Sequence, residues 1–144
     1  MDLATLLSAQ GALRSRFEDF RRALDRRDGE AYRLGLSDFL ACLRRWTEAQ
    51  EVALLPAILR AGIPGRDPRR ELRLEWVQLR ELTRYLLSQI NDRAPMADIL
   101  GFTENLERRF AAHEADLVSV YFGAAAPLLT AEERKILLDA APPP

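Results

Sequence analysis

The chain has 144 residues, of which 48% are apolar and 30% charged, and its formal net charge is −1. That length fits one domain, and the near-zero charge argues against a nucleic-acid-binding protein, which would carry a basic excess. One cysteine (Cys42) and one histidine (His113) exclude an internal disulfide framework and a conventional zinc site. Neither a membrane-length apolar run nor a secretion signal is evident, so we expect a cytoplasmic protein without a membrane contact.

Leu, Ala, Arg and Glu dominate the sequence, and apolar residues recur at steps of three and four. Both features predict an all-α protein. Four long amphipathic helices are expected over about residues 2–27, 30–61, 68–90 and 96–122, with Asp2 as the N-cap of the first. Thr130 and Glu133 have the spacing of a capping box that begins a short fifth helix ending near Leu138.

Short loops between four long helices predict an up-down-up-down four-helix bundle. The bundle and the fifth helix form a single domain over residues 1–141, and residues 142–144 are expected to be a disordered tail. The first helix pair weakly resembles the second, which indicates an internal repeat.

Polar residues on the apolar stripes are the most informative feature, because a buried polar group needs a partner. Antiparallel connectivity places them at one end of the core, together with both tryptophans, where helix bundles build metal and ligand sites. The six residues are Gln10, Trp46, Gln50, Trp76, Arg109 and His113. Glu51, Glu75 and Glu114 are their possible polar partners, and the amides of the two glutamines are possible acceptors for the indole N–H groups.

The spacing of these residues resembles that of the hemerythrin-like (HHE cation-binding) domain family, over about residues 3–138. The resemblance implies a histidine on the first and third helices, a His-x-x-x-Glu pattern on the second and fourth, and a non-haem di-iron centre held by them. In this chain the positions hold Gln10 on the first helix, Trp46 and Gln50 on the second, Trp76 on the third, and Arg109 and His113 on the fourth.

These substitutions remove the ligands that iron prefers, and Arg109 places a fixed positive charge at the metal position. We therefore expect a degenerate hemerythrin-like protein that has lost its di-iron site and uses no cofactor. It would act as a non-enzymatic interaction or regulatory module, on an unknown protein partner or as a homodimer. Two alternatives stay open: an iron-binding oxygen or redox sensor that uses His113 with nearby glutamates, and a small-molecule-binding bundle that uses the former metal cavity.

Overall fold

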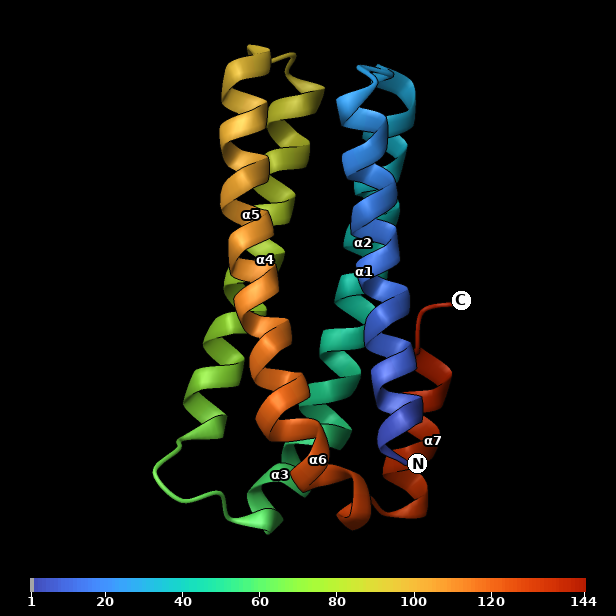
Figure 1. The fold of residues 1–144 in the computed structure, drawn as a ribbon, viewed down its shortest axis with the longest axis vertical. Coiled ribbons are helices and arrows are strands. Elements are labelled where there is room, and N and C mark those ends of the chain that lie inside the picture. Colours follow the sequence, from blue (N-terminus) through green and yellow to red (C-terminus); the bar gives the residue numbers. More distant parts are fainter. Residues whose placement is uncertain (1) are drawn as a thin grey trace.

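The structure, a computed structural model, describes residues 2–144. It confirms the all-α prediction, since residues 2–144 contain helices and turns but no strand. Figure 1 shows long helices that lie along one axis and run in alternating directions as the chain proceeds.

The helices follow the expected order, with local changes of helical type inside two of the long rods. The first rod is α1 (Leu3–Asp25), and the second combines α2 (Gly29–Ala49), the π-helical segment η1 (Gln50–Leu54) and α3 (Leu55–Ala61). The third rod is α4 (Pro68–Asn91). The fourth combines α5 (Met96–Asp116), the π-helical segment η2 (Leu117–Tyr121) and α6 (Phe122–Ala125), and the 3-10 turn η3 (Ala126–Leu128) precedes α7 (Ala131–Ala140).

Side-chain caps begin several of these helices. The carboxylate of Asp2 accepts the backbone N–H of Thr5 at 2.9 Å, as the sequence predicts. The capping box of α7 is also confirmed, because Thr130 Oγ1 accepts the N–H of Glu133 at 3.1 Å and Glu133 Oε1 accepts the N–H of Thr130 at 2.9 Å.

The first helix ends two residues earlier than expected. Asp25 is its last residue, and Arg27 adopts a left-handed conformation with φ of 58°. The chain must turn here within three residues, because Asp28 already takes an extended conformation as the N-cap of α2. A helix cannot continue through such a turn.

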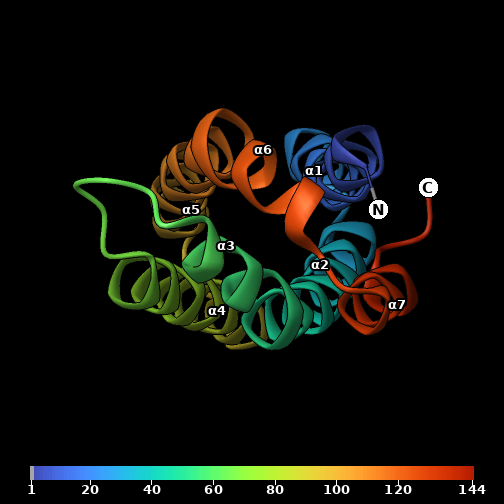
Figure 2. The same ribbon diagram turned by 90° about the horizontal axis from the view of Figure 1, so that it is seen from below.

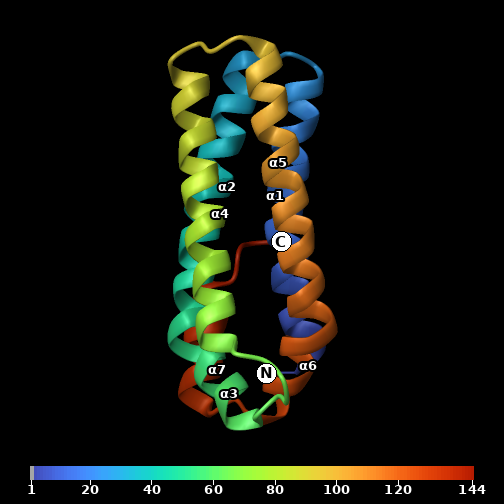
Figure 3. The ribbon, with the colours of Figure 1, turned by 90° about the vertical axis from the view of Figure 1, so that its left-hand side faces the viewer.

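The rods associate as two antiparallel pairs, α1 with α2 and α4 with α5, and the pairs join chiefly along α2 and α4. Figure 3 shows α4 beside α2, and Figure 2 shows α7 outside the ring of long helices, next to α2. On the opposite side, α1 and α5 approach each other mainly through side chains. Phe17 of α1 stacks on Phe110 of α5 with ring centroids 5.9 Å apart, and Phe39 of α2 lies edge-on to both.

The two π-helical segments occupy corresponding places in the second and fourth rods. In each, a backbone N–H reaches the carbonyl five residues earlier, from Leu55 to Gln50 and from Phe122 to Leu117. Pro56 explains the first segment in part, since it has no N–H to pair with the carbonyl of Val52. Single π turns inside α-helices occur frequently at functional sites.

The lower end of the molecule is held by contacts that cross its loops. Arg66, in the loop between α3 and α4, donates to Tyr121 Oη at 3.3 Å, and Tyr121 donates to Glu71 at 2.7 Å. Burial and the bond to Glu71 raise the pKa of the Tyr121 phenol.

The last three residues, for which disorder was expected, have no regular secondary structure. Pro142 is buried, and Arg16 donates to the carbonyl of Pro143 at 2.8 Å. None of the helices within residues 2–144 is both long enough and apolar enough to cross a bilayer.

Candidate functional site

Four of the six predicted residues lie in one buried layer, and each comes from a different long helix. Gln10, Trp46, Trp76 and His113 are exposed by only 2%, 0%, 0% and 4%. The internal repeat expected from the sequence predicts such a placement. Gln10 and Trp76 are 66 residues apart on α1 and α4, and Trp46 and His113 are 67 residues apart on α2 and α5. The two halves of the chain therefore bring equivalent positions to one level of the core.

Gln10 connects three helices in this layer. Its Oε1 accepts the indole N–H of Trp46 at 2.9 Å, and its Nε2 donates to Glu114 of α5 at 3.2 Å. Arg14, one turn further along α1, donates to the other oxygen of Glu114 at 2.7 Å. Both ends of the buried amide are satisfied, and the Glu114 carboxylate has two donors, so the layer is fully bonded on this side.

His113 forms the second connection, between α5 and α4. Its Nδ1 lies 2.6 Å from Glu75 Oε2, and the imidazole is buried whereas the Glu75 side chain is 30% exposed. A pocket of about 160 Å³ opens beside this pair on the surface between α4 and α5. Gln78, Leu79, Arg109 and Ala112 complete its lining.

Arg109 does not lie in the core, which corrects the prediction for the fourth helix. It is exposed and donates to Gln78 at 3.1 Å, and its neighbour Phe110 is the buried residue at 4% exposure. The physical reason is that a guanidinium cannot lose its proton and is costly to bury without a paired carboxylate, whereas burial of a phenyl ring is favourable. The buried stripe of α5 consists of Ile99, Thr103, Leu106, Phe110 and His113.

Gln50 and Trp76 are buried at this level too, but they are not bonded. The Oε1 atom of Gln50 and the Nε1 atom of Trp76 have no hydrogen-bond partner among residues 2–144. Glu51, the third predicted partner, points to the surface side and pairs with Arg73 of α4 at 3.1 Å.

The residues of this layer do not fit a di-iron centre. Such a centre requires several imidazoles and bridging carboxylates, whereas the four residues of the layer, together with the buried Gln50, offer one imidazole, two indoles and two amides. Within the described chain, no group of three or more His, Cys, Asp or Glu side chains is arranged to hold a metal ion. Two acids are bonded to this layer, Glu75 to His113 and Glu114 to Gln10 and Arg14.

Sequence reasoning missed a surface groove between α1 and α5, of about 410 Å³. Phe17 and Phe110 contribute apolar surface to its lining, and the ion pair of Arg14 and Glu114 lines it too. Neither phenylalanine differs in its sequence pattern from an ordinary core residue, so no sequence signal marks the groove.

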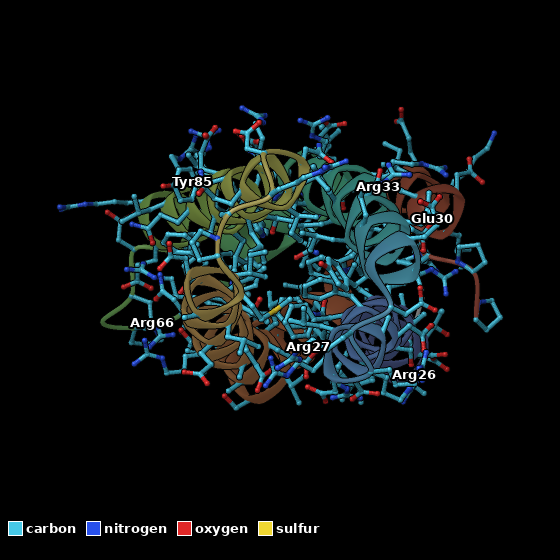
Figure 4. The ribbon with its side chains drawn as sticks, turned by 90° about the horizontal axis from the view of Figure 1, so that it is seen from above. Arg26, Arg27, Glu30, Arg33, Arg66 and Tyr85 are labelled. Atoms are coloured by element: carbon cyan, nitrogen blue, oxygen red, sulfur yellow. The ribbon has the colours of Figure 1, made fainter. Side chains whose placement is uncertain are left out.

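Figure 4 shows the upper end of the molecule, where Arg26, Arg27, Glu30 and Arg33 surround the turn between α1 and α2.

Comparison of the chain with models of protein families, with curated proteins and with solved structures found no match.

Proposed function

We propose that this chain is an up-down-up-down four-helix bundle of the hemerythrin-like type whose di-iron position is filled by side chains. It acts as a non-enzymatic interaction or regulatory module. The observation that carries the proposal is the buried layer of Gln10, Trp46, Trp76 and His113, with one residue from each long helix. Each lies where the resemblance places an iron ligand, and two of the four are indoles, which do not ligate iron.

The internal repeat supports a revised register for the fourth helix. Since His113 corresponds to Trp46, it takes the histidine place of the His-x-x-x-Glu pattern, and Leu117 takes the glutamate place that Gln50 holds in the second rod. In this register the proposed site keeps one histidine, His113, and has no carboxylate at either of the two glutamate positions. Leu117, which stands at the second glutamate position, is apolar and fully buried.

An interaction role follows from what the rest of the molecule offers. We propose that the partner is another protein or a second copy of the chain. Large apolar side chains that α4 exposes support a protein contact: Leu74, Val77 and Tyr85 are 54%, 47% and 50% exposed.

Elemental analysis tests the loss of the metal. After expression in iron-supplemented medium, we expect less than about a tenth of an equivalent of iron per chain, because the ligand types are wrong for tight binding. About one or two equivalents of iron would overturn the proposal and favour oxygen or redox chemistry at His113 and its neighbouring glutamates.

A reconstructed site tests the resemblance and the register together. The variant combines Gln10→His, Trp46→His, Gln50→Glu, Trp76→His and Leu117→Glu. We expect it to bind iron, while a matched variant that carries Arg109→His and His113→Glu in place of Leu117→Glu binds none. Equal iron contents in two helical variants would contradict the proposed alignment, and far-UV circular dichroism verifies that both are helical.

A further inference from the structure

Two polar atoms in the core have no hydrogen-bond partner within the described chain, and they are of opposite kind. Gln50 Oε1 is an acceptor and Trp76 Nε1–H is a donor. Their residues are 1% and 0% exposed. Buried polar groups in folded proteins are nearly always satisfied, by protein groups or by ordered water, because an unmade bond costs the full desolvation of the group.

Two contacts between the second rod and α4 place these residues at the same level. Arg73 of α4 pairs with Glu51 at 3.1 Å, and Arg80 of α4 donates to Thr47 Oγ1 at 2.9 Å. Trp76 stands between the two arginines on α4, and Gln50 stands between Thr47 and Glu51 on the second rod. Both side chains turn inward from this level, since both are buried.

The chemistry of the two atoms restricts what can lie between them. A cation would be repelled by the indole N–H, and an anion would be repelled by the amide oxygen, so a charged ligand leaves one of the two atoms unsatisfied. A neutral group that both accepts and donates a hydrogen bond satisfies both. Water is the smallest such molecule, and buried waters typically make two to four hydrogen bonds to groups of this kind.

We propose that one buried water molecule bridges the rods here, accepting from Trp76 Nε1–H and donating to Gln50 Oε1. This water completes the polar layer, since it links η1 of the second rod to α4, whereas Gln10 links α1 to α2 and α5 and His113 links α5 to α4. Gln50 is also the first residue of the π-helical segment η1, where the backbone is locally widened. The proposal does not depend on the hemerythrin-like assignment.

Nuclear magnetic resonance of the 15N-labelled protein tests the proposal with an internal control. The chain has two indole N–H signals, and the Trp46→Phe variant identifies the signal of Trp76. We expect a direct cross-relaxation peak between water and the Trp76 indole proton, of the sign that marks a water held for longer than a nanosecond. The Trp46 indole proton, which is bonded to Gln10, shows none.

A substitution at Gln50 tests the second bond of the bridge. In Gln50→Leu the acceptor is removed with little change of volume, and we expect the water peak of Trp76 to be lost. Absence of the peak in the natural protein overturns the proposal, as does a peak of unchanged intensity in Gln50→Leu. Because the first measurement needs no change at Gln50, the proposal stays testable even where Gln50→Leu fails to fold.

Discussion

The hydrogen bond between Gln10 and Trp46 provides a quantitative test of the buried layer. In Gln10→Met the side chain keeps its length but loses both polar atoms, so the fully buried Trp46 N–H has no partner. An unpaired buried donor costs about 1–3 kcal/mol, and the lost bond to the Glu114 carboxylate adds about 1 kcal/mol. We therefore expect the free energy of unfolding to fall by about 2–4 kcal/mol, which lowers Tm by roughly 5–15 °C in a domain of this size.

A double-mutant cycle separates the bond from the change of packing. Trp46→Phe alone leaves the Gln10 carbonyl unpaired, whereas the double variant leaves neither partner buried without the other. We expect the cost of the double variant to be about 1–2 kcal/mol smaller than the sum of the single costs. Urea denaturation followed by far-UV circular dichroism measures all four proteins without relying on tryptophan fluorescence. Additive costs would refute the reasoning, because they would mean that the two side chains are not bonded to each other.

Two further predictions concern α5 and α7. Phe110→Ala should lower the free energy of unfolding by about 3–5 kcal/mol, because a buried ring is lost from the core. Arg109→Ala, at the exposed neighbouring position, should change the free energy of unfolding by less than about 0.5 kcal/mol. Urea denaturation of both variants measures these changes, and a larger cost for Arg109→Ala would contradict the register of α5. The bond to Arg60 holds the pKa of Glu133 below its ordinary value, so the carboxylate stabilises the fold above the usual carboxyl range and loses this effect as pH falls through its folded pKa. Thermal melts of the natural protein and Glu133→Gln should accordingly converge once the pH falls below the folded pKa of Glu133, which lies below the ordinary carboxyl value, and a difference that persists in stronger acid would exclude this ion pair as its source.

Local signals in the sequence predict most of the helices. The cap at Asp2 and the capping box at Thr130 act through residues three positions apart, so they can be read without any tertiary information. The apolar stripes place Gln10, Trp46 and Trp76 in the core for a similar reason, since each helix has only one apolar face.

The fourth helix was harder because two stripes fit its sequence. One passes through Phe102 and Arg109 and the other through Thr103 and Phe110, and both include Leu106 and His113. Steps of three and four do not distinguish them. The cost of burying a guanidinium decides the matter in favour of Phe110, and this is a tertiary term that periodicity does not contain.

Two other features have no adequate local signal. Only Pro56 hints at the π turn of η1, and nothing comparable precedes η2. Gln10 and Arg14 both donate to Glu114, which lies 104 and 100 residues away from them along the chain. The sequence identifies Glu114 as a possible polar partner, but which side chains donate to it depends on how the helices pack.

The unequal seams of the molecule also bear on its motion. The α1–α2 pair and the α4–α5 pair are joined mainly along α2 and α4. The opposite edge, between α1 and α5, is closed by side chains such as Phe17 and Phe110. Fluctuations of lowest energy should therefore swing α1 and α5 apart while each pair stays intact. In hydrogen exchange, amides of α1 and α5 at the α1–α5 edge would then exchange before those at the α2–α4 interface. We expect the interior to meet solvent first at this α1–α5 edge, where side chains provide the closure.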